Sequence, residues 1–190
     1  MKPITMGFAM CGSFCTFDTV IRQLEILHEV FPDIQPILSE TSCGTDSRFG
    51  DAAGFIDRIE TICGKEIWKT IPEVEPIGPQ KLLDVLVVAP CTGNTLAKLA
   101  NGVTDTAVTM AVKAHLRNNR PVVLAVSTND GLSGSARNIG ELLNRKQIYF
   151  VPFRQDDPVR KPCSLMADFS KISETVQAAL VGEQLQPILA

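Results

Sequence analysis

The sequence lacks the segments that mark membrane and secreted proteins. No apolar run approaches the roughly 20 residues that span a bilayer. The first residues lack the apolar core and small-residue cleavage site of a secretion signal. No Asn-x-Ser/Thr glycosylation site with a permitted middle residue occurs anywhere. We therefore expect a cytoplasmic protein that has no membrane partner.

Strong charge and metal-ligand clusters are also missing. The formal net charge is -3 without a long block of like charge, so the sequence predicts no nucleic-acid partner. The six cysteines form no Cys-x-x-Cys pair, and the two histidines lie far from any cysteine pair. Because zinc ligands usually come in close pairs, we expect no metal site. Several cysteines are instead expected to be reduced core residues.

Two familiar nucleotide-binding motifs are absent. The sequence has no Gly-x-x-x-x-Gly-Lys-Ser/Thr, which argues against a nucleoside triphosphate site. It also has no Gly-x-Gly-x-x-Gly after an expected strand, so the usual dinucleotide fingerprint is missing. If NAD(P) is used, we expect a partner chain to hold it.

What the sequence does contain is a regular alternation of strand-like and helix-like segments. Its 190 residues are 45% hydrophobic and 21% charged, as is usual for one globular domain with its own core. The expected strands cover residues 4–10, 34–38, 84–89, 122–126 and 148–151. We predict a single flavodoxin-like (Rossmann-like) α/β domain, with a parallel sheet and helices on both faces. The domain is expected to cover residues 1–181, and residues 182–190 are expected to form a loose tail.

Helical spacing and turn residues place the remaining elements. The expected helices are one that follows Thr16 as its cap, residues 48–63, 94–100 and 105–117, one around Ile139 to Leu143, and a last one that carries Leu165, Phe169, Ile172, Val176 and Leu180. Asn101-Gly102 is a typical helix end. Pro90 is expected to end the third strand, and the three prolines within residues 72–79 predict a loop.

Candidate ligand contacts follow the expected strands, because open α/β sheets bind ligands beyond their carboxyl ends. After the first strand, Gly12 permits close backbone approach, and Ser13 offers a hydroxyl at a helix start. This pattern fits a phosphate cradle, and it also fits an ordinary βα turn. After the fourth strand, the hydroxyl and amide groups of Ser127, Thr128 and Asn129 fit either ligand contacts or a capped turn.

The most informative segment follows the third strand. Thr92, Asn94 and Thr95 place three polar side chains at a helix start, where a cap explains only one of them. Lys98 lies one turn further along the same helix. The alternative interpretation is a capped helix with a solvated lysine.

Two further segments at the ligand edge allow two interpretations each. Arg160 and Lys161 follow the fifth strand and suit a carboxylate substrate, although they also fit a solvated basic pair beside two aspartates. The stretch from Ser39 to Gly54 is rich in hydroxyl groups and follows the second strand. It is expected to be either a mobile lid that contacts a ligand or a solvent loop.

The segment from Pro90 to Asp105 resembles a family pattern, Pro-x-x-x-Asn-Thr-x-Ala-Lys-x-Ala-x-Gly-x-x-Asp. This pattern is that of the homo-oligomeric flavin-containing decarboxylases and the flavin prenyltransferases. The resemblance implies a bound FMN and a homo-oligomer, either a trimer or a multiple of one. The implied FMN contacts are Gly12, Ser13, Ser39, Pro90, Thr92, Asn94, Thr95, Ser127, Thr128 and Asn129.

The Asn94 segment is followed in order by Ser127-Thr128-Asn129-Asp130-Gly131-Leu132-Ser133 and by Arg160-Lys161-Pro162. Together with the N-terminal strand and loop, these runs make nearly the whole chain resemble the flavoprotein component of a two-component oxidoreductase of spore-forming bacteria within this family. That resemblance implies oxidation of a dihydrodipicolinate-type small molecule to pyridine-2,6-dicarboxylate. It also implies a second component that carries a nicotinamide-binding domain. The implied substrate contacts are Asn94, Lys98, Arg137, Asn138, Arg160 and Lys161. No residue is identified as catalytic.

The sequence departs from the decarboxylases in two respects. The stretch from Ser39 to Asp84 contains no histidine, although they use one there, and their Pro-x-Met-Asn-x-x-Met clamp is absent. His28 and His115 are expected to be structural or surface groups. Two alternatives therefore stay open. The chain could be a flavin prenyltransferase or FMN-dependent decarboxylase, or it could be a non-catalytic component that binds a substrate or partner.

Overall fold

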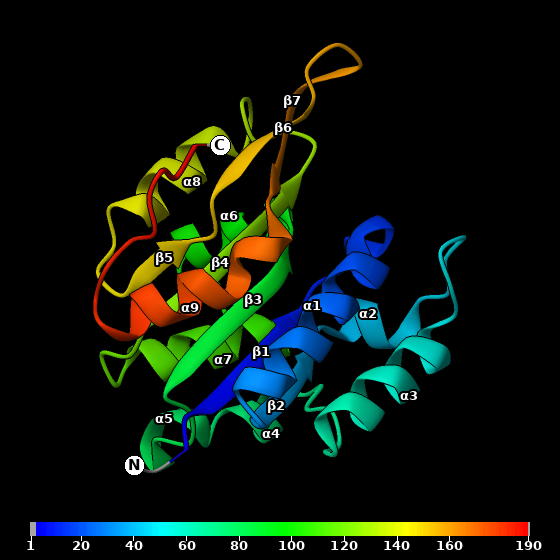
Figure 1. The fold of residues 1–190 in the computed structure, drawn as a ribbon, viewed down its shortest axis with the longest axis vertical. Helices are drawn as coiled ribbons and strands as arrows, with labels where there is room; N and C mark the ends of the chain where they lie inside the picture. The colour runs from blue at the N-terminus through cyan, green and yellow to red at the C-terminus, as the bar shows by residue number, and fades with distance from the viewer. Residues whose placement is uncertain (1–2, 190) are drawn as a thin grey trace.

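The computed structural model describes residues 3–189, which form an α/β domain around one seven-stranded sheet (Figure 1). The strand order is β2-β1-β3-β4-β7-β6, and β5 pairs with β4 outside this path. The strands are β1 Thr5–Met10, β2 Asp33–Leu38, β3 Val85–Cys91, β4 Val122–Thr128, β5 Ile148–Phe150, β6 Phe153–Asp157 and β7 Lys161–Ala167. Strands β1 to β5 pair in parallel, which confirms the predicted fold class.

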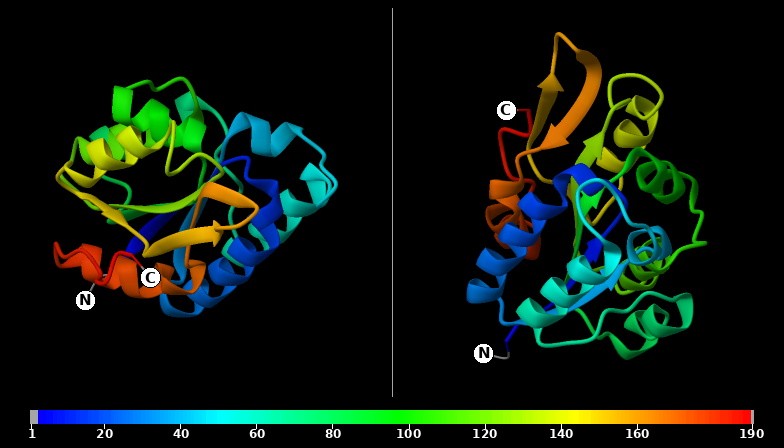
Figure 2. Two further views of the ribbon diagram at one scale, coloured as in Figure 1. Left: turned by 90° about the horizontal axis from the view of Figure 1, so that it is seen from above. Right: turned by 90° about the vertical axis from the view of Figure 1, so that its right-hand side faces the viewer.

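Helices cover both faces of the sheet (Figure 2). Helices α1 and α9 pack on one face, and α6, α7 and α8 lie on the other. The helical elements are η1 Phe14–Thr16, α1 Phe17–Val30, α2 Glu40–Gly44, α3 Ala52–Cys63, α4 Ile71–Val74, α5 Ile77–Gln80, α6 Gly93–Asn101, α7 Ala107–Leu116, α8 Ala136–Leu143, η2 Phe169–Lys171 and α9 Ile172–Leu180. Within residues 3–189, none of them is long and apolar enough to cross a bilayer.

The core lies between the sheet and its two helical layers. Every residue of β3 is buried, as expected for a central parallel strand that is covered on both faces. Phe8 on β1 and Phe17 on α1 are among the largest fully buried side chains. Burial of this kind supplies the main favourable term in folding, roughly 25 cal/mol for each Å² of apolar surface removed from water.

The prediction that Pro90 ends the third strand is wrong. Strand β3 continues through a cis Ala89-Pro90 peptide to Cys91. The pairing of β3 with β4 shifts register between Val88 and Cys91, and at such an irregularity a proline that lacks an N–H is tolerated. The Pro90 carbonyl oxygen accepts a hydrogen bond from the Cys11 amide, so it ties β3 to the loop after β1.

The expected loop over residues 72–79 contains two short helices, α4 and α5. Pro72 lies in the first turn of α4, where a missing N–H costs no helical hydrogen bond. Thr70 and Glu73 form a reciprocal capping box at the same turn. The prolines therefore start helices here.

Helix α1 begins directly after Thr16, as predicted, whereas two other expected helix starts move. Helix α3 begins at Ala52 because the Asp51 side chain caps it, and α7 begins at Ala107 behind the Thr106 cap. A short 3-10 turn precedes α1, so Thr16 donates its hydroxyl proton to the Ser13 carbonyl and does not cap the helix with its side chain.

The last third of the chain holds the largest difference from the prediction. Residues 153–167 form an antiparallel hairpin of β6 and β7, which projects from one end of the domain (Figure 1). Leu165 therefore lies in β7, outside the last helix. The sequence hides this hairpin because most side chains of β6 are polar and exposed. Gln184 ties the expected loose tail to β5 through hydrogen bonds to both backbone groups of Phe150.

Candidate functional site

The carboxyl ends of β1, β2, β3 and β4 meet at one edge of the sheet, and each leads into polar residues. Cys11, Ser39 and Thr92 follow the first three strands, and Ser127 lies near the end of β4. Two adjoining cavities lie at this edge. The first, which we name the α6 cavity, has a volume of about 250 Å³ and is lined by Cys11, Gly12, Ser39, Thr41, Thr92, Asn94, Thr95, Lys98 and Thr106.

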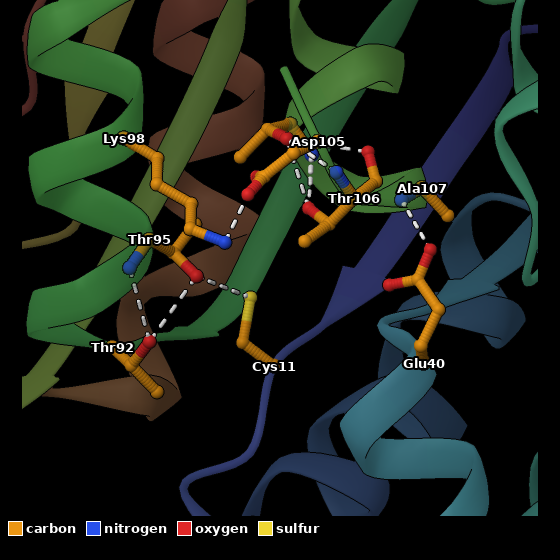
Figure 3. A network of polar contacts seen from close by, with 9 residues as sticks. Cys11, Glu40, Thr92, Thr95, Lys98, Asp105, Thr106 and Ala107 are labelled. Carbon is orange, nitrogen blue, oxygen red and sulfur yellow. Dashed lines mark hydrogen bonds and ion pairs between the residues drawn. The ribbon is translucent and has the colours of Figure 1, made fainter. Parts of the chain in front are cut away.

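The start of α6 forms one wall of the α6 cavity (Figure 3). The Thr92 hydroxyl oxygen accepts a hydrogen bond from the Thr95 amide, so Thr92 is the N-cap. The Thr95 hydroxyl group donates to Cys11 Sγ at 3.2 Å. Asn94 is exposed and makes none of these capping contacts, which leaves its amide group available to a ligand.

Lys98 supplies the positive charge of the α6 cavity. Its Nζ lies 2.8 Å from Asp105 Oδ1, which belongs to the connection between α6 and α7 (Figure 3). The hydrogen bond from Lys98 lowers the pKa of the Asp105 carboxyl group, which therefore carries its charge at neutral pH. An anionic ligand would have to share Lys98 with this carboxylate.

Two buried thiols near the site have raised pKa values. Burial raises the pKa of Cys11 to about 11, against a smaller opposing effect of the Thr95 hydrogen bond. Burial also raises the pKa of Cys91 well above its usual value. A protonated thiol is a poor nucleophile. Both residues are buried and pack as small apolar groups, Cys11 in the cavity wall and Cys91 within β3, as the sequence predicted for several cysteines.

The second cavity, which we name the Ser13 cavity, has a volume of about 90 Å³. It is lined by Ser13, Cys15, Thr16, Ser127, Thr128, Asn129, Asp156, Lys161, Ser164, Leu165 and Met166. The hydroxyl groups of Ser13 and Ser127 form a hydrogen bond of 2.9 Å inside it. Lys161 Nζ lies 2.8 Å from Asp156 Oδ2, so this cavity also presents a lysine that is paired with an aspartate.

A close junction joins the end of β4 to the start of α6. The Thr128 hydroxyl donates to Asp130 Oδ1 at 2.5 Å, and hydrogen bonds from Thr128 and Ser135 lower the pKa of Asp130. A Cβ atom on Gly93 would lie 2.5 Å from Thr128 Oγ1 and 2.9 Å from Asp130 Oδ1. Only glycine fits this contact, so the junction fixes the start of α6 against the loop after β4.

Most of the predicted ligand residues lie around these two cavities, but four of them line neither. Pro90 is buried within β3, and Arg137 and Asn138 lie in the first turn of α8. Arg160 is exposed at the turn of the β6–β7 hairpin, next to Lys161. Thr41 lines the α6 cavity and belongs to the stretch from Ser39 to Gly54, which was predicted to be either a ligand-contacting lid or a solvent loop. Sequence reasoning missed Cys15, Thr106, Asp156 and Ser164 as lining residues. Of these, Thr106 had a readable signal, because a threonine before an apolar helix is a typical cap.

Other features of the described residues lie away from this edge. A larger cavity of about 530 Å³ opens between α5 and α7, beyond the other end of the sheet. His115 is fully buried, and His28 lies on α1. Among residues 3–189, no three potential ligand side chains come together to hold a metal ion.

Comparison with known proteins identifies the family. The chain matches the Flavoprotein family model over residues 1–180. It belongs to the Flavoprotein family. It is 43% identical to the B subunit of dipicolinate synthase from Bacillus subtilis (strain 168) over 189 residues, which cover 100% of this chain and 94% of that protein.

Solved structures agree with this similarity. The B subunit of dipicolinate synthase from Bacillus halodurans C is 43% identical and superposes with a TM-score of 0.91, over 98% of this chain and 96% of that one. The FMN-dependent cysteine decarboxylase SpaF shares the fold at 20% identity, with a TM-score of 0.69 over 94% and 95% of the two chains. The Flavoprotein family's α/β fold therefore covers nearly the whole chain.

Proposed function

We propose that this chain is the flavin-binding B subunit of a two-component dipicolinate synthase. It would take part in the oxidation of dihydrodipicolinate to dipicolinate (pyridine-2,6-dicarboxylate) during spore formation. The observation that carries this proposal is the full-length similarity, at 43% identity, to the B subunit of the Bacillus subtilis enzyme. A B subunit implies a partner, and we propose that the A subunit of dipicolinate synthase binds NAD(P), because no dinucleotide fingerprint occurs here.

The α6 cavity fits FMN by the chemistry of its lining. Hydroxyl and amide groups suit the ribityl chain and the polar edges of a flavin ring. The Gly12 amide in the loop after β1 and the first amides of α2 and α6 would offer backbone N–H groups to a phosphate, whereas the Cys11 and Ser13 amides already donate to backbone carbonyls. The combined volume of the two cavities is near the lower end of the range that is usual for small-molecule sites, roughly 300–1000 Å³. A second copy of the chain would enlarge such a site, and we propose a homo-oligomer, either a trimer or a multiple of one.

We assign roles to residues according to their place at the sheet edge. Gly12 and Ser13 would hold the flavin phosphate. The ring and ribityl chain would lie among Ser39, Thr92, Asn94, Thr95, Ser127, Thr128 and Asn129, with Pro90 fixing the strand behind them. Lys98 and Lys161 would attract the substrate carboxylates. We also propose four further substrate contacts: Asn94, Arg137, Asn138 and Arg160. Arg160 is included because it lies on the hairpin beside Lys161.

The reaction removes two electrons and two protons from the dihydropyridine ring. A flavin held by these residues would supply an acceptor for a hydride, which carries two electrons and one proton, and the second proton would pass to solvent. The residues of this chain would bind and orient the substrate and exclude water from it. The α6 cavity lining contains no carboxylate and no histidine, so we assign no proton transfer to it.

The lack of a carboxylate and a histidine in the lining of the α6 cavity favours a second candidate function. A site without an acid/base pair suits a chain that binds or delivers the substrate while the partner performs the redox step. In that case the flavin site would be vestigial. Flavin binding separates the two candidates.

Titration with FMN, followed by the quenching of flavin fluorescence, tests the proposal. We expect wild type to bind FMN, and Ser13→Ala and Asn94→Ala each to weaken binding by roughly tenfold, as expected for a lost hydrogen bond to a bound group. Thr61→Ala is the matched control, because it removes an exposed hydroxyl group on α3. Lack of binding by wild type at tens of micromolar FMN would reject the flavin role and favour the substrate-binding candidate.

A further inference from the structure

Helix α2 forms the outer wall of the α6 cavity, and it has few bonds to the rest of the domain. It covers only five residues, Glu40–Gly44, behind Ser39, whose hydroxyl oxygen caps it. The Ser39 amide donates to the Met10 carbonyl, which attaches the start of the wall to β1. Thr41 leans over the loop after β1, since its Cγ2 lies 3.6 Å from the position of a Cβ on Gly12.

One long-range hydrogen bond holds this helix in place. Glu40 Oε1 accepts the amide proton of Ala107 at 3.1 Å, across 67 residues of sequence (Figure 3). In the part of the chain that the structure describes, no other hydrogen bond links α2 itself to a different helix or strand. Ala107 is the first residue of α7, where an amide has no partner within the helix and a negative charge is favoured.

The residues just before Ala107 form the opposite wall of the same cavity. Thr106 lines the cavity and caps α7. Asp105 holds Lys98 of α6 through their ion pair. Residues 105–107 therefore engage Lys98 on one side, through Asp105, and Glu40 on the other, through the Ala107 amide, as Figure 3 shows.

We propose that Glu40 is a positioning residue of the flavin site, which sets the distance between the α2 wall and the α6–α7 wall. The inference rests on the proposed function, because it takes the α6 cavity as the place of the flavin. Glu40 does not line the cavity itself, so it acts through Ser39, Thr41 and Thr106. Glu40 is exposed and α2 lies at the periphery, so removing the Glu40 side chain should leave the core intact.

Three variants separate positioning from a general effect of charge. Glu40→Ala removes the acceptor. Glu40→Gln keeps an acceptor oxygen but loses the negative charge. Glu29→Ala removes an exposed glutamate on α1, on the far side of β1, and leaves the α6 cavity unchanged. Thermal unfolding of each variant would verify that the core has folded.

The readouts are hydrogen–deuterium exchange and FMN affinity. We expect Glu40→Ala to speed exchange in residues 40–47 and at the start of α7, while α9 stays unchanged. It should raise the Kd for FMN by about fivefold, within the range for the loss of a charged helix cap. Glu40→Gln should give a smaller increase, and Glu29→Ala should stay within twofold of wild type.

Two results would overturn the proposal. Unchanged exchange in Glu40→Ala would mean that the contact does not hold α2. Faster exchange with an unchanged Kd would mean that the contact holds α2 but does not position the flavin site. If wild type bound no FMN, the proposed function would fail, and the exchange rates alone would still decide whether Glu40 fixes the wall.

Discussion

The hydroxyl oxygens of Ser13 and Ser127 lie 2.9 Å apart, although 114 positions separate these residues in the sequence. Ser13 follows β1 and Ser127 lies near the end of β4, with β3 between the two strands. Their hydrogen bond spans the carboxyl edge of the sheet and lines the Ser13 cavity. It joins the loop after β1 to the end of β4, and the proposed flavin site requires these two segments to keep a fixed relative position.

We predict that Ser13 and Ser127 act as a coupled pair in flavin binding. Ser127→Ala should weaken FMN binding, and its effect should not add to that of Ser13→Ala, because either change removes the same hydrogen bond. A double-mutant cycle of FMN affinities should give a coupling energy of about 1 kcal/mol. Strictly additive effects would mean that the two hydroxyl groups contact the ligand independently or not at all.

The junction at Gly93 predicts a large loss of stability on adding one methyl group. Gly93→Ala would press its Cβ against Thr128 Oγ1 and Asp130 Oδ1, so we expect the free energy of unfolding to fall by about 1–3 kcal/mol. Gly140 on α8 is the matched control, because a Cβ there meets no other atom within 4 Å. Gly140→Ala should stabilise the protein by about 0.4–1 kcal/mol. Urea unfolding of both variants measures the difference, and equal effects would contradict the close junction.

His115 predicts a pH dependence of stability. It is fully buried; its Nε2–H donates to the Pro121 carbonyl at 3.1 Å, and its Nδ1 has no hydrogen-bond partner within residues 3–189. Burial lowers its pKa from 6.5 to about 4. Between these two values the unfolded chain binds a proton that the folded chain does not, so the free energy of unfolding falls as the pH falls. The titration of His115 alone should lower the free energy of unfolding by about 2 kcal/mol between pH 7 and pH 5.

The variant His115→Gln tests that assignment, because glutamine keeps an N–H donor but does not titrate. Its free energy of unfolding at pH 7 should be lower than that of wild type, and the difference should shrink as the pH falls to 5. Urea unfolding at several pH values supplies both curves. Parallel curves would show that another group causes the acid sensitivity.

The Lys98–Asp105 pair predicts opposite effects on the binding of dicarboxylates. Lys98→Met should weaken the binding of dipicolinate, the proposed product. Asp105→Asn should strengthen it, because the ligand no longer competes with a carboxylate for Lys98. Calorimetric titration at low and high salt measures the dipicolinate affinity of each variant. The difference between each variant and wild type should shrink at high salt, because salt screens the charges. Equal affinities in the two variants would place the substrate carboxylates elsewhere.

The sequence predicted the parts of the fold in which burial and chemistry agree. Strand β3 reads as a continuous apolar run because both of its faces are covered, and Gly102 ends α6 with a φ of 72°, as the Asn-Gly signal indicated. Thr92, Asn94 and Lys98 lie together because they share one helix start. Local sequence determines each of these features.

The parts that sequence reasoning missed depend on partners far along the chain. The exposed face of β6 gives no apolar alternation, and β6 exists because β7 pairs with it. Pro90 continues a strand because the register shifts at the neighbouring strand. Asp156 lines the Ser13 cavity only because the hairpin folds over the sheet edge. No local spacing predicts such contacts.

Reconstitution with the A subunit of dipicolinate synthase tests the central proposal most directly. The rate of dipicolinate formation from dihydrodipicolinate would be measured by its ultraviolet absorbance, with that partner alone, with this chain added, and with Asn94→Ala in place of wild type. We predict little product without this chain, a rate that rises to saturation as FMN-loaded chain is added, and a rate at least tenfold lower with Asn94→Ala. An equal rate from the partner alone would contradict the proposal that this chain takes part in the oxidation.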